Sequence, residues 1–488
     1  MTRRGIEHSI ADRSAFFLLM LLLIWLPWPW ASVSQSAQGL ASAVTGVALL
    51  FSLLSPEGGK WPQTAIFRIA NLIWLLWMGW LVFSLVPLPE PVLRNLSPYA
   101  ADLHAATKGI GAQPAWTISV EPASTRRVFF QSLNLWGLYL LAARTVHSEF
   151  RRRAFLVILA VTASAQALYG LGMTLTGVEI GFLEKKTYGL GWATGTFVNR
   201  NHFAHFLALG AAASLGLLVA QPRSDTAQEG WRGRLLRVIA WLMSPAAVWR
   251  ISLLIMLSAV VLSQSRMGNV SIMVALISGV LLWVILYARA KIVPALLLLS
   301  SFAVADLWIV DQYYGLSRVV DRLEDTELET EQRSVALGEL TPLLDEFAWV
   351  GSGAGSFQSV FLSVQSRKLR GFYDHAHNEY AETLVETGFV GLLALLGMGA
   401  LHFLHALGIL RQRKQAIARA LGLAGVVALI AAGLHAAVDF IFHIPATCAW
   451  LVALLGVLAA TRRTSNGRHR AVEMGDNSVG DTMSQSTR

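Results

Sequence analysis

Apolar segments of about 20 residues alternate with shorter polar segments along most of the chain. A helix of that length crosses the hydrocarbon core of a bilayer. The pattern predicts an all-α polytopic membrane protein with about twelve transmembrane helices. The predicted spans are residues 14–33, 36–54, 66–86, 126–144, 154–176, 201–220, 250–265, 269–288, 292–310, 387–410, 416–438 and 444–461.

Composition supports this class. The 488 residues are 55% hydrophobic and 14% charged, whereas soluble globular chains carry about 25% charged residues. Residues 1–30 resemble a signal peptide, but we expect an uncleaved first span because no clear small-residue cleavage site ends the apolar stretch. The single cysteine, Cys448, excludes an internal disulfide and a cysteine-based metal cluster.

The net charge of +9 could indicate nucleic-acid binding, but the placement of the charges argues against it. With the N-terminus placed in the cytoplasm, twelve spans bring the basic loops to one side, as the positive-inside rule requires. We therefore expect both termini to lie in the cytoplasm. These basic positions are Lys60, Arg144, Arg151 to Arg153, Arg223, Arg232, Arg234, Arg237, Arg250, Arg289, Lys291, Arg411, Arg413, Lys414, Arg462 and Arg463.

This topology divides the chain into four parts: an N-terminal bundle of about nine spans (1–310), a long periplasmic loop (311–386), C-terminal transmembrane helices (387–461) and a disordered tail (462–488). A shorter outer loop, 87–125, is Pro-rich and is expected to form an ordered cap. Within the long loop, residues 316–347 have the apolar spacing of an amphipathic helix. The following Gly351 to Ser356 (GSGAGS) is interpreted as a turn, because it lacks the Lys-Ser/Thr of a phosphate loop.

The end of the long loop, GFYDHAHNEYAETLVETGFVG (371–391), places titratable groups beside a span. His375 and His377 could bind a diphosphate or take a proton from a hydroxyl near neutral pH. Asn378 and Glu379 would support them. The alternative is an ordinary helix N-terminus capped by Asn378 with solvated histidines. A His-x-His pair could also bind metal, but no third ligand is evident, so we expect none.

Three arginines on the outer side are candidate phosphate ligands. Arg266 lies between two spans with almost no loop, where a cation is usually paired or functional; it could also be a snorkelling anchor. Arg200 begins a span, flanked by Asn199 and Asn201, which could equally be ordinary capping residues. Arg333 could bind a ligand or form a surface ion pair. Asp439, near an outer helix end, is a weaker candidate for a base or positioning group.

Taken together, these residues resemble the O-antigen ligase and polymerase family (Wzy_C type) of bacterial envelope enzymes. Four blocks carry the resemblance: GTFVNRNHFA (195–204), SQSRMG (263–268), residues 332–357 with DHAHNEYAETLVETGFVGL (374–392), and HAAVDFIFHIPATCAWL (435–451). The chain departs from many members at Arg200, which puts the role of that residue in doubt.

The resemblance implies a fold similar to the C-type glycosyltransferases and a metal-independent, inverting glycosyl transfer at the periplasmic face, with no cofactor. The donor would be a glycan on undecaprenyl diphosphate or a similar polyprenyl diphosphate, and the acceptor a hydroxyl of lipid A-core or of another polysaccharide. Arg266 and Arg333 would bind the diphosphate, and His377 would act near the acceptor hydroxyl or the leaving phosphate.

Several alternatives stay open at this point. A ligase in lipopolysaccharide biosynthesis, an O-antigen or exopolysaccharide polymerase and a protein O-glycosylating enzyme share the donor chemistry. The sequence also does not decide which of His375 and His377 is essential. A lipid-linked glycan transporter or flippase fits the span count, but it would place its polar groups near the membrane midplane, whereas here they gather in an outer loop.

Overall fold

A computed structural model of the chain describes residues 3–55, 61–107, 116–221, 244–287, 335–367, 369 and 373–463. Regular structure in these ranges is helical, apart from one isolated bridge between Ile180 and Lys185. Helices occupy eleven of the twelve predicted spans, and the other, 292–310, lies outside the described residues. These helices are α1 (Arg3–Trp25), α2 (Gln35–Leu54), α3 (Ala65–Phe83), α6 (Pro122–Thr145), α7 (Glu149–Thr176), α8 (Arg200–Val219), α10 (Ala247–Leu262), α11 (Arg266–Tyr287), α15 (Glu379–Gln412), α16 (Ala416–Ala436) and α17 (Pro445–Ala460).

Within the described part of the chain, seven helices are long and apolar enough to cross a membrane: α2, α3, α7, α8, α11, α15 and α16. Helices α10 and α17 are apolar but shorter, at 16 residues each. The described residues thus form an all-α structure with the helices of a multi-pass membrane protein, as expected. The count of twelve spans stays a prediction.

The first predicted span, 14–33, was wrong in its extent. Helix α1 ends at Trp25 because Pro27 and Pro29 follow, and proline cannot continue the backbone hydrogen-bond pattern of a helix. The chain then turns through η1 (Trp30–Ser32), a short 3-10 helix. The Thr196 hydroxyl donates to the Pro27 carbonyl at 2.6 Å, which fixes this turn against the loop before α8.

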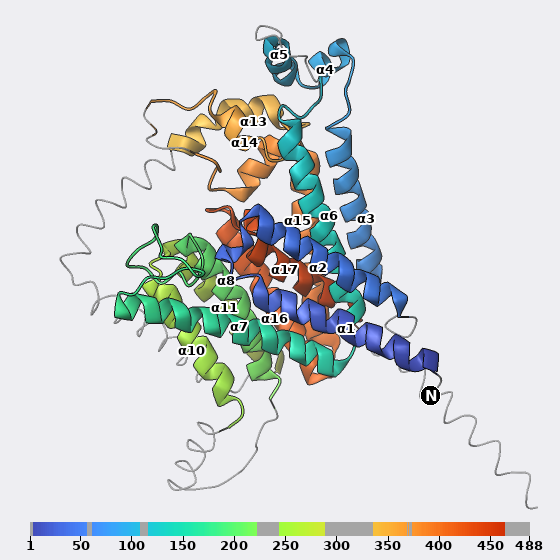
Figure 1. Cartoon of the computed structure of the whole chain (residues 1–488), viewed down its shortest axis with the longest axis vertical. Coiled ribbons are helices and arrows are strands. Elements are labelled where there is room, and N and C mark those ends of the chain that lie inside the picture. Colours follow the sequence, from blue (N-terminus) through green and yellow to red (C-terminus); the bar gives the residue numbers. More distant parts are fainter. Residues whose placement is uncertain are drawn as a thin grey trace, which may run out of the picture.

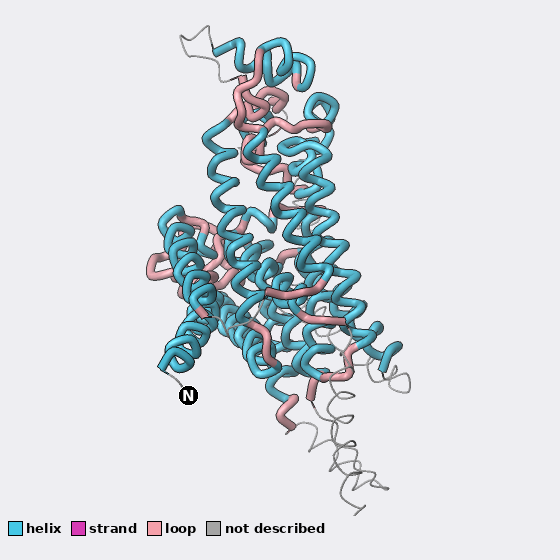
Figure 2. Tube along the Cα trace, turned by 90° about the vertical axis from the view of Figure 1, so that its right-hand side faces the viewer, coloured by secondary structure: helices cyan, strands magenta, loops and turns pink. Residues whose placement is uncertain are grey.

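Helices α8 and α16 form the centre of the bundle. α16 packs on α8, α15 and α11, while α7 and α10 cover the other sides of α8 (Figures 1 and 2). Small residues allow these close contacts, as they do between membrane helices in general. At Gly216, for example, an added Cβ would lie 2.6 Å from the carbonyl oxygen of Ala420. The core of the bundle is therefore specified by alanine and glycine as much as by leucine.

Above the bundle in Figure 1 lies a group of four short helices, which we call the cap: α4 (Glu90–Leu96), α5 (Pro98–Ala106), α13 (Thr341–Phe347) and α14 (Phe357–Phe361). Its parts come from two loops far apart in the sequence, joined by the Tyr99 ring edge against Phe347 and a 2.8 Å backbone bond from Val120 to Ser352. The predicted amphipathic helix 316–347 is described only from residue 335, where residues 335–339 and α13 are helical.

Helix α15 begins earlier than the predicted start at residue 387. The Asn378 side chain accepts from the backbone N–H groups of Tyr380 and Ala381 at 3.1 and 3.0 Å, so the helix starts at Glu379. Gly388, with φ 63°, then breaks the helix at the place where the sequence predicted its beginning. Glu379, Glu382 and Glu386 of the motif therefore lie on a helical segment above a kink, whereas His375 and His377 lie in the loop that leads into it.

Candidate active site

The first feature of the site is a network of two carboxylates and two imidazoles. His375 Nδ1 lies 2.6 Å from Glu382 Oε1, and His443 lies 3.2 Å from Glu379 Oε2 and 3.5 Å from Glu382 Oε1. Glu379 and Glu382 are nearly fully buried. His443 belongs to η4 (Ile441–His443), so the network joins the start of α15 to the connection between α16 and α17.

Each carboxylate in this network also accepts a backbone N–H. Ala376 donates to Glu382 Oε2 and Phe442 to Glu379 Oε1, both at 2.8 Å. Burial opposes a charge on His443, but the carboxylates of Glu379 and Glu382 outweigh it and raise the pKa of His443 to about 10. His443 is therefore an imidazolium at neutral pH, and it stabilises two buried negative charges.

A second network is centred on Asp439, which is buried between α16 and η4. Its carboxylate lies 2.5 Å from Asn201 Nδ2, 3.3 Å from His377 Nδ1 and 3.7 Å from His202 Nε2. Burial raises the pKa of the Asp439 carboxyl, but the neighbouring imidazoles of His202 and His377 prevail and hold that pKa well below its usual range. Asp439 is thus a buried anion that orients His377.

Two residues at or beside this network have strained backbone conformations. His377 and Gln264 have φ values of 49° and 58°, in the left-handed region that non-glycine residues seldom adopt. Such outliers persist only where the surrounding structure enforces them, and they concentrate at functional sites. Here the two outliers hold His377 beside Asp439 and turn the chain between α10 and α11.

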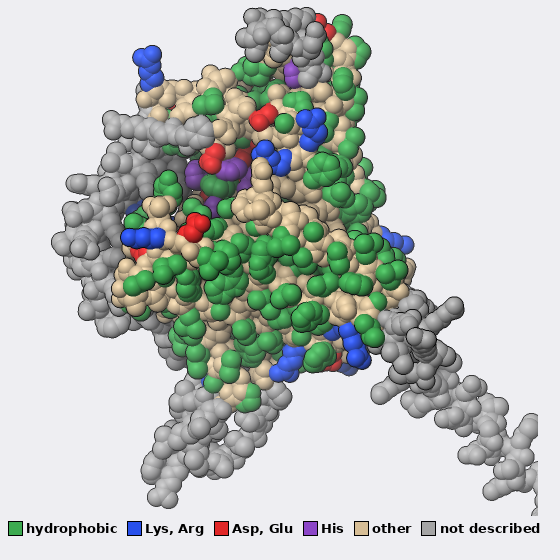
Figure 3. Space-filling view, viewed as in Figure 1, with side chains coloured by type: hydrophobic (Ala, Val, Ile, Leu, Met, Phe, Trp, Pro, Cys, Tyr) green, Lys and Arg blue, Asp and Glu red, His purple; other side chains and the backbone are tan. Residues whose placement is uncertain are grey.

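Phe440 joins the two networks. Its ring stacks on His375 with the centroids 4.1 Å apart, and it contacts His202 and His377 edge-on at 4.7 and 5.1 Å. Figure 3 shows histidine and acidic side chains gathered in a hollow of the surface beneath the cap. Four imidazoles and three carboxylates therefore meet at one end of the bundle, around a single aromatic ring.

The structure brings two of the three candidate arginines to this end of the bundle. Arg266 is exposed at the first position of α11, directly after Ser265, whose hydroxyl donates to Asn201 Oδ1 at 2.8 Å. Arg200 is the first residue of α8, after the N-cap Asn199, and its guanidinium lies 4.0 Å from the centre of the Trp192 ring.

Arg333 lies outside the described residues. Arg266 and His377 are nevertheless connected through Ser265, Asn201 and Asp439, so they share one side of the molecule.

The GSGAGS turn (351–356) forms a binding site for a carboxylate of the chain itself. Gly355 N and Phe357 N each donate to the Glu386 carboxylate at 2.9 Å. At Gly351 an added Cβ would lie 2.3 Å from the Glu386 carbonyl oxygen, so only glycine fits there. Its interpretation as a turn rather than a phosphate loop agrees with this geometry, because Glu386 occupies the anion-binding N–H groups.

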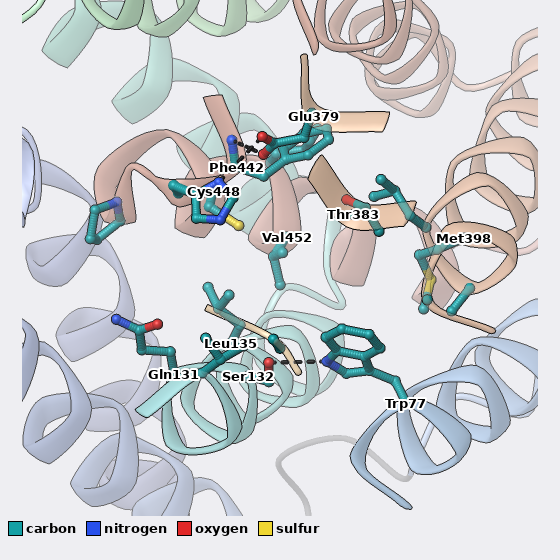
Figure 4. Close-up of a pocket in the computed structure, with 18 of the residues that line it drawn as sticks. Trp77, Gln131, Ser132, Leu135, Glu379, Thr383, Met398, Phe442, Cys448 and Val452 are labelled. Carbon is teal, nitrogen blue, oxygen red and sulfur yellow. Dashed lines mark hydrogen bonds and ion pairs between the residues drawn. The ribbon is translucent and has the colours of Figure 1, made fainter. Parts of the chain in front are cut away.

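A cavity of about 1430 Å³, which we call the chamber, extends from the first network into the bundle between α2, α3, α6, α15, α16 and α17. Glu379 and Phe442 lie at one end, opposite Gln131, Ser132 and Trp77, with Val452 between them (Figure 4). Pockets for small molecules usually measure about 300–1000 Å³. The chamber is larger than these, and most of its wall is apolar.

Three groups of the first network could hold a metal ion. The ligand atoms of His375, Glu382 and His443 lie within 4.8 Å of one another. The structure therefore places Glu382 and His443 beside His375 as possible metal ligands, although the sequence indicated no third ligand for the His375 and His377 pair. His377 is not part of this group. In the geometry described, the proton of His443 provides the positive charge between the carboxylates. The absence of a catalytic metal stays a prediction.

Sequence reasoning missed several members of the site. Glu382, His443, His202 and Phe440 were not among the candidates. A signal for Glu382 was present, because it lies three positions after Glu379 and therefore on the same helix face. His443 and Phe440 lie close to Asp439 in the sequence, but their approach to α15 depends on the turn after α16, which no local pattern reveals.

Residues 251–396 match the family model Wzy_C, described as O-antigen ligase. The matched range includes Arg266, His375, His377 and Glu382, and it ends below the Gly388 kink of α15. No curated protein matches the chain. The resemblance seen in the sequence is thus confirmed over residues 251–396, and it supports a membrane glycosyltransferase-like role.

Proposed function

We propose that this protein transfers a glycan from a polyprenyl diphosphate carrier to an acceptor hydroxyl, as an O-antigen ligase or a polymerase of the same family. One observation carries the proposal. Arg266 and His377 both lie in the range that matches the O-antigen ligase model, and Ser265, the neighbour of Arg266, is hydrogen-bonded through Asn201 and Asp439 to His377. Glycosyl transfer from a diphosphate needs this combination of a phosphate-binding cation and a carboxylate-oriented imidazole.

The proposed reaction is a single displacement. The acceptor oxygen forms a bond to the anomeric carbon of the donor, and the bond from that carbon to the diphosphate oxygen breaks, which inverts the configuration. The electron pair of the broken bond leaves on the diphosphate, and the hydroxyl proton passes to an imidazole. Binding the diphosphate next to the imidazole converts an encounter of two lipids into a reaction within one complex.

Each part of the site has a role in this scheme. Arg266, with Arg200 and Arg333, neutralises the diphosphate through charge-assisted hydrogen bonds. His377, held by the buried charge of Asp439, and His375, held by Glu382, are the two imidazoles available for the proton. Asn199 and Asn378 cap the helices that carry these groups. No metal is required, since cations and imidazoles of the chain supply the charge and the base.

We place the site on the periplasmic side of the inner membrane, with both termini in the cytoplasm. Basic residues between the spans support this orientation. In this arrangement residues 1–310 and 387–461 form the membrane bundle, and residues 311–386 contribute part of the cap and the histidines.

The test is reconstitution of the purified full-length chain in vesicles with a polyprenyl-diphosphate glycan and an acceptor, with and without a chelator. We expect transfer that His377→Ala abolishes and that the chelator leaves unchanged. Loss of transfer with the chelator would overturn the metal-free scheme. Translocation of the carrier lipid that survives His377→Ala, without glycan transfer, would instead identify a transporter.

Deletion of the protein in cells distinguishes a ligase from a polymerase. Loss of glycan attached to lipid A-core indicates a ligase, and loss of long glycan repeats indicates a polymerase.

A further inference from the structure

The chamber has a polar end and an apolar interior, and no role in the scheme above accounts for it. Along α15 its wall runs from Glu379 to Phe403. From Gly391 to Phe403, below the kink, this wall corresponds to about 18 Å of helix. That length exceeds the thickness of one leaflet of the hydrocarbon core, which is about 15 Å. Its length and apolar wall suit hydrocarbon chains.

The polar end of the chamber is unsuited to a diphosphate. Among the described residues that line it, four are carboxylic acids and one is an arginine, together with the His375 and His443 imidazoles. The four acids are Asp374, Glu379, Glu382 and Glu386, and the arginine is Arg127. A diphosphate here would add its own negative charge to this wall. Carboxylates and imidazoles are, in contrast, good hydrogen-bond partners for sugar hydroxyls.

The candidate diphosphate ligands lie outside the chamber. Arg200, Arg266 and His377 are not among the residues that line it, whereas His375 is. Phe440 contacts both histidines, with His375 stacked on one face of the ring and His377 at its edge. The first network thus lines the chamber, while His377 of the second network lies outside it against the same aromatic ring, which suits an enzyme that aligns two lipid substrates.

We propose that the chamber binds the acceptor, a membrane glycolipid, with its acyl chains in the apolar interior and its sugar hydroxyls on the Glu379–His443–Glu382–His375 network. The polyprenyl diphosphate binds on the other side of Phe440, at Arg266. The assignment of donor and acceptor rests on the proposed function. The occupancy of the chamber by an acylated glycolipid rests on its shape, polarity and charge.

Glycines in the chamber wall allow a direct test. Gly399 on α15 and Gly39 on α2 line the chamber, and a Cβ on either would meet nothing within 4 Å. A tryptophan at either position therefore fills the chamber without displacing the backbone. Gly397, also on α15, has the same open surroundings but does not line the chamber. Gly397→Trp is the matched control.

Binding of two probes to the full-length protein in nanodiscs would be measured, a lipid A-core glycolipid and undecaprenyl diphosphate without glycan. We expect Gly399→Trp and Gly39→Trp to weaken glycolipid binding about tenfold or more, since displacing two methylene groups from an apolar wall suffices for that change. Binding of undecaprenyl diphosphate should stay within about twofold, and Gly397→Trp should change neither probe.

The inference is overturned if the wild-type protein does not bind the glycolipid, if filling the chamber weakens undecaprenyl diphosphate binding, or if it changes neither probe. A failure of the proposed function has a different signature. Both tryptophan variants could lose binding of the glycolipid alone while the reconstituted wild-type protein transfers no glycan. In that case the chamber is a glycolipid site in a protein of another activity.

Discussion

Replacing Asp439 with asparagine removes one negative charge from the centre of the second network while keeping the shape of the side chain. The asparagine keeps one acceptor oxygen, so it can accept either from Asn201, which donates to Asp439 Oδ2, or from Phe440 N, which donates to Oδ1 at 2.9 Å. It can no longer stabilise a protonated His377 or hold that ring through a charge-assisted hydrogen bond. The substitution therefore separates the orienting charge of the site from its packing.

The magnitude follows from the contacts of Asp439. A hydrogen bond to a charged group contributes about 1.5–3 kcal/mol, and each 1.36 kcal/mol is a factor of ten in rate. Loss of the charged contact between Asp439 and His377 should lower the transfer rate about 10- to 150-fold, if the imidazole takes a proton in the transition state. Asp439 is only 1% exposed, so water cannot replace the lost charge.

Initial rates of glycan transfer in reconstituted vesicles would test this, at saturating donor and acceptor. Asp345→Asn, the same chemical change at an exposed position of α13 in the cap, is the control and should keep the wild-type rate. Thermal unfolding in detergent verifies that both variants are folded. If Asp439→Asn retained the wild-type rate, His377 would not need a charged partner, and the role proposed for the second network would be wrong.

Three further predictions concern charge, ligand binding and backbone geometry. His443 has a pKa of about 10 in the folded protein, above its unfolded value of about 6.5. The stabilisation that its charge provides is therefore complete below pH 6.5 and is lost as the pH rises through 10. The unfolding temperature should fall between these pH values, and His443→Gln should make that fall smaller. Arg266→Ala should weaken undecaprenyl diphosphate binding about 10- to 100-fold, measured by titration. Arg266→Lys should recover only part of the lost affinity, because the lysine ammonium lacks the forked donors of a guanidinium. At Gly388 an added Cβ would lie 2.4 Å from the Trp349 carbonyl oxygen. Gly388→Ala should therefore lower the unfolding temperature by at least the equivalent of about 1–3 kcal/mol of backbone strain, whereas Gly397→Ala, in open surroundings, should not. Equal unfolding temperatures for these two variants would contradict the strain at the kink.

The sequence predicted the helical bundle well, because membrane spans are encoded by local runs of apolar residues. It failed where the outcome depended on single residues or on distant contacts. Two prolines after Trp25 shortened the first helix, and the Asn378 cap moved the start of α15 upstream of the apolar run. The apolar run itself begins at Phe389, directly after the Gly388 break.

The site was predictable in part for the same reason. His375, His377 and Arg266 were recognisable because polar groups beside a span are costly and therefore conspicuous. Their partners were not recognisable as such. Asn201 and Asp439 are 238 positions apart, and their hydrogen bond exists only because α8 packs on α16. The cap and the chamber likewise arise from helices that are distant in the sequence.

The most direct test of the central claim is an experimental structure of the full-length protein with undecaprenyl diphosphate bound. The account predicts the diphosphate within hydrogen-bonding distance of the Arg266 guanidinium, on the His377 side of Phe440, with the chamber left for a second lipid. A diphosphate seated inside the chamber against Glu379 and Glu382, away from Arg266, would contradict it.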